Sequence, residues 1–223
     1  MMVRHDLLTC MRDRARFDTA KLCQRIMRII GLTGGIATGK STVSNYLSSK
    51  YKLPVLDADI YAREATVKGS PILPAIFAHF GDRIKLADGS LDRSALGDLV
   101  FSNPKAKQWL ESKIHPYVRD RFNRELAKIK NDTVVLAIPL LFEANLTHLV
   151  TEIWVVSCSE EIQLARLQQR NHLSLEGAKN RINSQLPLQE KIAQADFVLD
   201  NNFTLKHLYQ QCDAILFADE RKS

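Results

Sequence analysis

The fold of this chain is decided by one stretch, Gly34-Gly35-Ile36-Ala37-Thr38-Gly39-Lys40-Ser41. It fits the pattern G-x-x-x-x-G-K-[S/T], in which glycines let the backbone wrap so that several N–H groups converge on a phosphate. We expect a buried apolar strand before it, at residues 28 to 33, and a helix after it, at residues 41 to 50. Strand, glycine loop and helix together predict a site for the phosphates of a nucleoside triphosphate.

The last residues of this loop carry the chemistry. Lys40 adds a mobile positive charge that can bridge the β- and γ-phosphates, and the Ser41 hydroxyl can bind a Mg²⁺ ion on the same phosphates. We therefore expect ATP or GTP binding, with Mg²⁺ as the cofactor. The expected contacts with the nucleotide are Gly34, Gly35, Ile36, Ala37, Thr38, Gly39, Lys40, Ser41 and Thr42.

Four further short apolar runs alternate with segments of helix length. The strands are expected at residues 54 to 57, 133 to 138, 152 to 156 and 197 to 199, and the helices at residues 103 to 130, 159 to 170, 175 to 185 and 203 to 217. Continuous apolar runs are typical of strands that are buried on both faces of a parallel sheet. The alternation predicts a doubly wound α/β fold. Two connections exceed a simple crossover and are expected to carry function, at about residues 60 to 132 and 169 to 196.

Two aspartates follow the second predicted strand. The carboxyl ends of strands in open α/β sheets bind ligands, so Asp57 and Asp59 are expected near the phosphate loop. A carboxylate there can take a proton from an acceptor hydroxyl. The alternative for either residue is a helix N-cap, which aspartate also performs well. The third strand runs into Pro139 rather than a metal-binding aspartate, and no N-K-x-D motif for guanine is present.

Composition limits the remaining classes. The 223 residues are 45% apolar and 25% charged, which excludes disordered and fibrous chains. The net charge is +6, but residues 1 to 26 hold six bases and three acids, so the rest does not indicate nucleic-acid binding. The longest uncharged stretch, residues 69 to 81, is too short to span a membrane. Four scattered cysteines favour a reducing, cytoplasmic location for a soluble protein.

Residues 1 to 26 form a basic segment without the apolar core of a secretory signal, and its three aspartates and lack of serine are atypical of a transit peptide. We expect a translated upstream leader ahead of a start at Met27, with a helical extension or a targeting peptide as the alternatives. The folded domain is then expected over residues 27 to 217, followed by a tail at residues 218 to 223, and a monomer is the expected state.

Several segments of the chain resemble the dephospho-CoA kinases. The run from Ile30 to Thr42, followed by Asp57-Ala-Asp-Ile-Tyr-Ala-Arg63, is similar to the opening of that family. Later segments agree in order: residues 79 to 81, 87 to 93, 101 to 104, 115 to 116, 138 to 143 and 195 to 201. The resemblance covers Met27 to about Phe217 and leaves only the leader and the tail outside it.

This resemblance implies transfer of the ATP γ-phosphoryl group to the ribose 3′-hydroxyl of dephospho-CoA, the last step of coenzyme A synthesis. It implies a three-layer sandwich of the P-loop nucleoside triphosphate hydrolase type, with a parallel five-stranded sheet, a helical acceptor-binding insertion and a lid. By matching, Asp59 takes the place of the family's proposed base, with Lys40 and Arg170 as its catalytic partners. Further contacts implied by the family pattern are Arg166 and Asn201 for ATP, and Asp57, Arg63, His115, Leu141 and Phe142 for the acceptor.

Other interpretations stay open for some of these residues and for the activity. His115 precedes Pro116 and can either line the acceptor pocket or adjoin a kink in a helix, and Leu141 and Phe142 can equally belong to the core. Arg166 and Arg170, four apart on one helix face, can also be solvated charges. A nucleoside or nucleoside-monophosphate kinase shares the loop, and a nucleotide-driven regulatory module is the alternative from another class.

Overall fold

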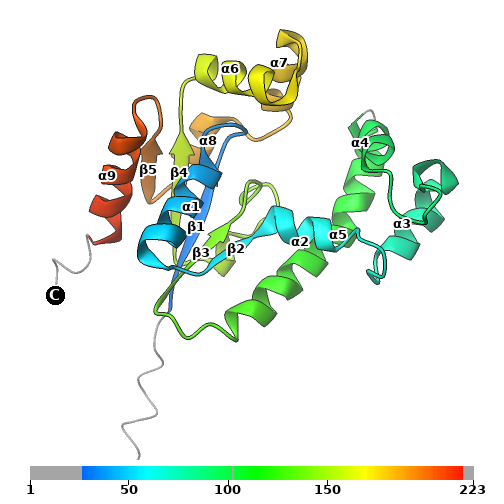
Figure 1. Cartoon of the computed structure of the whole chain (residues 1–223), viewed down its shortest axis with the longest axis horizontal. Helices are drawn as coiled ribbons and strands as arrows, with labels where there is room; N and C mark the ends of the chain where they lie inside the picture. The colour runs from blue at the N-terminus through cyan, green and yellow to red at the C-terminus, as the bar shows by residue number, and fades with distance from the viewer. Residues whose placement is uncertain (1–26, 102, 218–223) are drawn as a thin grey trace, which may run out of the picture.

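A computed structural model describes residues 27–101 and 103–217 of the chain (Figure 1). The predicted leader at residues 1 to 26 and the predicted tail at residues 218 to 223 lie outside the described residues.

Within these ranges the strands form one five-stranded sheet. The strands are β1 (Arg28–Gly34), β2 (Val55–Asp57), β3 (Thr133–Ala137), β4 (Glu152–Ser157) and β5 (Phe197–Asp200). All four pairings are parallel, in the order β2-β3-β1-β4-β5. The predicted parallel sheet is confirmed, and each predicted strand ends within one residue of the observed strand.

Helices occupy the connections between the strands. They are α1 (Lys40–Tyr51), α2 (Ala58–Glu64), α3 (Leu73–Phe80), α4 (Arg93–Phe101), α5 (Pro104–Leu126), α6 (Glu160–Asn171), α7 (Leu175–Asn183), α8 (Leu188–Ile192) and α9 (Leu205–Leu216), with 3₁₀ turns η3 (Asp82–Ile84) and η4 (Thr147–Leu149). The helix predicted at residues 103 to 130 ends earlier, at Leu126. The reason is local, because Lys128 and Ile129 donate to the carbonyls three residues before them and tighten the chain into turns.

The sheet is covered on both faces because the side chains of each strand alternate between them. On one face, Ile30 and Leu32 of β1 pack with α1 and α9 in a core that includes Leu47 and Leu208. On the other face, the core contains Val134 and Leu136 of β3, which pack with α2 and α5. The three-layer arrangement predicted for the chain is therefore confirmed.

A third apolar core lies in the connection between β2 and β3. Ile76 of α3, Ile84 of η3 and Leu96 of α4 are buried together, and Trp109 of α5 packs against them. In Figure 1 the helices α3 and α4 lie away from the sheet, joined to it through α5, whereas α6 and α7 lie beyond the strand ends. The two long connections thus lie on two sides of the carboxyl edge of the sheet.

The order of the strands locates the functional edge. β1 is the central strand, with β3 on one side and β4 on the other, so the chain reverses its winding direction at β1. Open α/β sheets bind ligands at the carboxyl ends of the strands at such a point. The phosphate loop directly follows β1 and therefore lies at this position.

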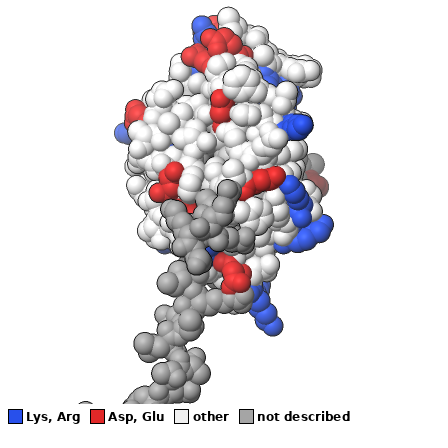
Figure 2. Space-filling view, turned by 90° about the vertical axis from the view of Figure 1, so that its left-hand side faces the viewer, with Lys and Arg blue, Asp and Glu red and all other residues white. Residues whose placement is uncertain are grey.

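The surface around α9 is mixed in charge. Figure 2 shows that, on this face of the described residues, Lys and Arg side chains are interspersed with Asp and Glu side chains in small groups. Among the helices of residues 27–101 and 103–217, none combines the length and the apolar character that crossing a bilayer requires.

Candidate active site

The phosphate loop adopts a conformation that its small residues permit. Gly39 has φ 109°, and a Cβ atom there would collide with the amide of Asn201. Ala37 also lies in the left-handed region, with φ 61°. The Asn201 side chain is buried and donates from Nδ2 to the Thr38 carbonyl at 2.7 Å. Asn201 therefore supports the loop from behind, and its Oδ1 atom is buried without a hydrogen-bond partner.

Helix α6 holds the outer part of the loop. Gln163 donates from Nε2 to the Ile36 carbonyl at 2.7 Å, and Arg166 donates from Nη1 to the Ala37 carbonyl at 3.2 Å. Because these bonds occupy carbonyl groups, the loop can turn its N–H groups toward a phosphate. Helix α1 begins behind the loop without a side-chain cap, which leaves its N-terminal N–H groups for an anion.

A cavity of about 630 Å³ lies in front of the loop. Its walls come from the phosphate loop, the start of α1, the β3–β4 connection and α6. The lining residues are Gly34, Gly35, Ile36, Ala37, Gly39, Lys40, Ser41, Thr42, Asp59, Pro139, Leu140, Arg166, Gln169, Arg170 and Gln185. We call it the phosphate cavity. It gathers most residues predicted to contact the nucleotide, whereas Thr38 is buried behind the loop.

A second cavity, of about 910 Å³, adjoins the first. Most of its wall is apolar, with Val100 and Phe101 of α4, Ile114 of α5 and Leu146 after β3. Arg93, Lys107 and Arg181 also line it, together with the acids Asp59, Asp98 and Glu111, and Glu111 lies 4.0 Å from Lys107. We call it the acceptor cavity. Its apolar wall suits the body of a large organic molecule, and its cations offer partners for phosphate groups on that molecule.

The two cavities meet at a small set of residues. Asp59, Ile36, Pro139, Leu140 and Gln185 line both of them. A group bound on the phosphate loop and a group bound in the acceptor cavity therefore face a common boundary, and Asp59 is the acid on it.

Asp57 and Asp59 have different surroundings. Asp57 is the N-cap of α2, where Oδ1 accepts from the Asp59 N–H at 2.8 Å, and its Oδ2 lies 3.7 Å from Lys40 Nζ. The Asp59 carboxyl has no such cap role. Asp59 is exposed at the cavity boundary, but partial desolvation by the surrounding protein raises its pKa above the ordinary aspartate value, and the Lys40 charge partly opposes that shift. A carboxylate with a raised pKa is a better proton acceptor, which suits a general base.

The predicted arginines differ in their contacts. Arg166 is tied to loop carbonyls, as described above. Arg170, one turn further along α6, is exposed and lines the phosphate cavity, with Nε donating to Asn171 at 3.0 Å. Its position allows the guanidinium to reach a bound phosphate.

The acceptor-side predictions divide into two groups. His115 lines the acceptor cavity, and α5 continues through Pro116. Arg63 lines an adjoining hollow of about 470 Å³, together with Asp59. Leu141 and Phe142 form the second group and line neither cavity.

Leu141 and Phe142 are not placed on the acceptor cavity. Leu141 is fully buried in the core between the sheet and α5, and Phe142 is partly buried and lines neither cavity. Leu140, one residue earlier, lines both cavities. An apolar run of this kind does not tell which of its residues turns outward.

Some residues that hold the loop or line a cavity carry little signal in the sequence. Gln163 and Gln185 bind the loop through side-chain amides, and Arg93 and Lys107 reach the acceptor cavity from α4 and α5. Neither glutamine belongs to a short motif. The two cations lie in a long connection, and residue spacing alone does not predict how that connection packs. Of these four residues, Arg93 alone lies in a stretch that resembles the family pattern, residues 87 to 93.

In the described part of the chain, no group of three or more His, Cys, Asp or Glu side chains is placed to hold a metal. Oxygen groups near the loop include the Ser41 hydroxyl and the Asp59 carboxylate, which line the phosphate cavity, and the Asp57 carboxylate, 3.7 Å from Lys40 Nζ. Hydroxyl and carboxylate oxygens are the ligands that Mg²⁺ takes together with phosphate oxygens.

A parallel sheet with the phosphate loop after its central strand, and a carboxylate between a phosphate cavity and an acceptor cavity, define a phosphotransferase of the P-loop class. The family model for dephospho-CoA kinase matches residues 28–207. A dephospho-CoA kinase of Trichormus variabilis is 60% identical over 189 residues, which cover 85% of this chain and 96% of that protein. The chain belongs to the dephospho-CoA kinase family.

Solved structures agree with this assignment. A Thermus thermophilus protein has a TM-score of 0.74 and 36% identity, with 85% of this chain and 96% of that chain covered. The dephospho-CoA kinase from Campylobacter jejuni has a TM-score of 0.64 and 30% identity, with 87% and 98% covered. Membership of this family excludes the two alternatives left open by the sequence, a nucleotide-driven regulatory module and a nucleoside or nucleoside-monophosphate kinase.

Proposed function

We propose that this chain transfers the γ-phosphoryl group of ATP to the ribose 3′-hydroxyl of dephospho-CoA, which gives coenzyme A and ADP. One observation of the structure carries the proposal: Asp59 lines both the phosphate cavity and the acceptor cavity. A transfer between two bound molecules requires such a boundary, because the reacting atoms must be held close together and in line. Family membership names the acceptor.

On the phosphate side, the loop N–H groups and the start of α1 bind the β-phosphate. Lys40 and Arg170 supply positive charge to the oxygens of the transferred group, and Arg166 keeps the loop in position through its carbonyl contacts. Most of the rate enhancement in phosphoryl transfer comes from such positioning and charge.

At the boundary, the Asp59 carboxylate accepts the proton of the attacking 3′-hydroxyl. The hydroxyl oxygen forms a bond to the γ-phosphorus while the bond from that phosphorus to the β,γ-bridging oxygen breaks, and ADP leaves. Asp57 orients Asp59 through the backbone N–H that it accepts and holds Lys40 near the reacting groups.

Mg²⁺ is the divalent ion that we propose for this site. Ser41 is exposed at the start of α1 and would hold it through the hydroxyl, with the carboxylates of Asp57 and Asp59 nearby. When bound, the ion neutralises phosphate charge.

In the acceptor cavity, the apolar wall suits the pantetheine arm, and His115 lies on the same wall. Arg93, Lys107 and Arg181 provide cations for the acceptor's diphosphate. Arg63 adds a cation in the adjoining hollow. We assign the acceptor-binding insertion to residues 60 to 132 and a lid to residues 169 to 196, since both segments contribute to these walls.

We also propose a cytoplasmic, monomeric enzyme. Cys158 and Cys212, the cysteines within the described residues, are free and buried, which suits a reducing compartment. Size-exclusion chromatography with light scattering tests the monomer.

The decisive experiment is an ADP-release assay with ATP and Mg²⁺, in which dephospho-CoA is compared with adenosine, cytidine, CMP and no acceptor. We expect turnover with dephospho-CoA alone and a product phosphorylated at the 3′-hydroxyl, as located by NMR. Equal ADP release without an acceptor, or preferential turnover of a nucleoside, would overturn the proposal.

A further inference from the structure

The side chain of Gln185 is bonded to the phosphate loop from outside it. Its Oε1 atom accepts from the Ile36 N–H at 2.8 Å. Both residues line both cavities. A residue that follows α7, about 150 positions after the loop in the chain, thus contacts it where the transferred group must pass.

The backbone beside Gln185 is anchored to the β3–β4 connection. The Leu186 N–H donates to Glu143 Oε1 at 3.0 Å, and Lys191 Nζ lies 2.8 Å from the same oxygen. Lys191 is fully buried. A buried ammonium that loses its carboxylate is strongly unfavourable, so this pair holds the base of the α7–α8 connection in place.

Lys191 also connects this region to β1, the strand that precedes the phosphate loop. Lys191 Nζ also donates to the Pro139 carbonyl at 3.1 Å, and the same carbonyl accepts from Thr33 Oγ1 at 3.1 Å. Thr33 belongs to β1, directly before the loop. The polar contacts therefore form a closed circuit from β1 through α8 to Gln185 and back to the loop.

This circuit leaves the Ile36 N–H occupied, so a phosphate on the loop uses the N–H groups that follow it. The bond also holds the first half of the loop at the boundary of the two cavities, which Asp59 lines as well. Phosphoryl transfer is sensitive to such placement, because an error of about 1 Å can lower the rate about 10²-fold.

We propose that Gln185 is a positioning residue for phosphoryl transfer, acting through the Ile36 N–H to hold the phosphate loop in register with the acceptor cavity. This inference rests on the kinase activity proposed above. Gln185 is assigned no proton transfer and no direct role in binding the adenine of ATP.

The test compares Gln185→Met, which keeps the length but lacks the acceptor atom, with Gln185→Asn, which keeps the amide but is too short. The matched control is Gln189→Met, an exposed residue of α8 outside both cavities. Wild-type turnover of dephospho-CoA is measured first, because its absence would reject the proposed function rather than this inference.

We expect both Gln185 variants to lose about tenfold or more in kcat, with the Kd for ADP changed less than about threefold and the melting temperature within about 2 °C. Gln189→Met should match the wild type in all three. A kcat within about twofold of wild type in either Gln185 variant would overturn the proposal, as would a kcat loss that parallels equal losses of ADP affinity and melting temperature.

Discussion

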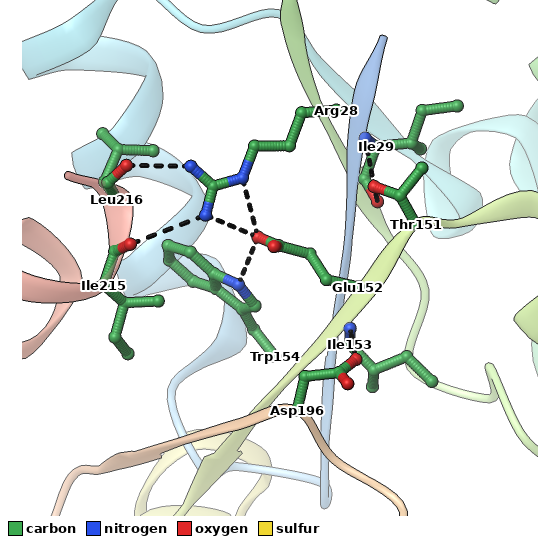
Figure 3. Close-up of polar contacts among 9 residues, drawn as sticks. All are labelled: Arg28, Ile29, Thr151, Glu152, Ile153, Trp154, Asp196, Ile215 and Leu216. Atoms are coloured by element: carbon green, nitrogen blue, oxygen red, sulfur yellow. Dashed lines mark hydrogen bonds and ion pairs between the residues drawn. The ribbon is translucent and has the colours of Figure 1, made fainter. Parts of the chain in front are cut away.

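The two ends of the central strands use polar groups in opposite ways. At the amino end, Arg28 of β1 and Glu152 of β4 satisfy one another and their neighbours (Figure 3). At the carboxyl end, Lys40, Ser41 and Arg170 line a cavity, and the buried Oδ1 of Asn201 has no partner. Polar groups that saturate one another stabilise a fold, whereas groups directed at a cavity remain for a ligand.

The amino end is closed by one arginine. Arg28 donates from Nε to Glu152 Oε1 at 3.0 Å and from Nη1 to the Leu216 carbonyl at 2.8 Å. The same glutamate oxygen accepts from Trp154 Nε1 at 2.8 Å. Figure 3 shows the guanidinium directed at the last turn of α9, where a cation also opposes the negative end of the helix dipole. This cluster attaches α9 to the sheet.

The comparison predicts that substitutions at the carboxyl end lower kcat and leave the melting temperature nearly unchanged. Substitutions at the amino end should lower the melting temperature and leave kcat nearly unchanged. The largest expected effect is on Asp59. Asp59→Asn should lower kcat by about 10² to 10⁴ and retain ATP binding, because it removes the proton acceptor only. Steady-state kinetics and ATP titration measure both.

The exposed Asp82→Asn in η3 is the control for this variant. The wild-type kcat should rise with pH through the raised pKa of Asp59, and that limb should be absent from Asp59→Asn. A kcat loss below about threefold would remove Asp59 as the base.

Lys40→Ala is expected to lower kcat by about 10²- to 10³-fold, because a charge is lost where negative charge develops. Its ion pair with Asp57, at 3.7 Å, contributes only about 0 to 1 kcal/mol, so the melting temperature should shift by no more than about 3 °C. The control is Lys206→Ala, an exposed residue of α9. Wild-type kcat in Lys40→Ala would contradict the site.

Arg28→Met should lower stability and leave kcat nearly unchanged. Loss of the guanidinium leaves the mostly buried Glu152 without its ion pair and with the Trp154 hydrogen bond alone. We expect about 3 kcal/mol less stability, or about 6 to 12 °C in melting temperature. The kcat per folded molecule should stay within about twofold, since the cluster lies at the end of the sheet opposite the cavities. Calorimetry and kinetics together make the test, with the exposed Arg119→Met as control.

A kcat loss in Arg28→Met as large as that of Lys40→Ala would break the comparison between the two ends of the sheet.

The smallest expected effect is a gain in stability. Because the folded-state pKa of Asp59 is raised, the folded protein binds this proton more tightly than the unfolded chain does. The favourable contribution is present below the unfolded pKa and is lost as pH rises through the folded pKa. Asp59→Asn should therefore melt slightly above the wild type at neutral pH, with the difference vanishing near pH ~3. A lower melting temperature at neutral pH would contradict this.

The features predicted correctly from the sequence are those that depend on residues close together in the chain. The five strands and the phosphate loop depend on apolar runs and glycine positions, which neighbouring residues determine. The end of α5 was predicted four residues too late because a change from helix to turns leaves little trace in composition. For Leu141 the sequence left the acceptor and the core open, and the structure places it in the core, because alternation after the strand depends on how the β3–β4 connection turns.

By itself the sequence determined the parallel sheet, the phosphate loop and, through ordered segments, the kinase family, because each depends on residues close together in the chain. Only the tertiary structure decided that Asp59 lines both cavities, that Leu140 rather than Leu141 faces them, and that Gln185 reaches the Ile36 N–H. These facts join residues up to about 150 positions apart. Their distances are set by how the helices pack on the sheet, and no local pattern encodes that packing.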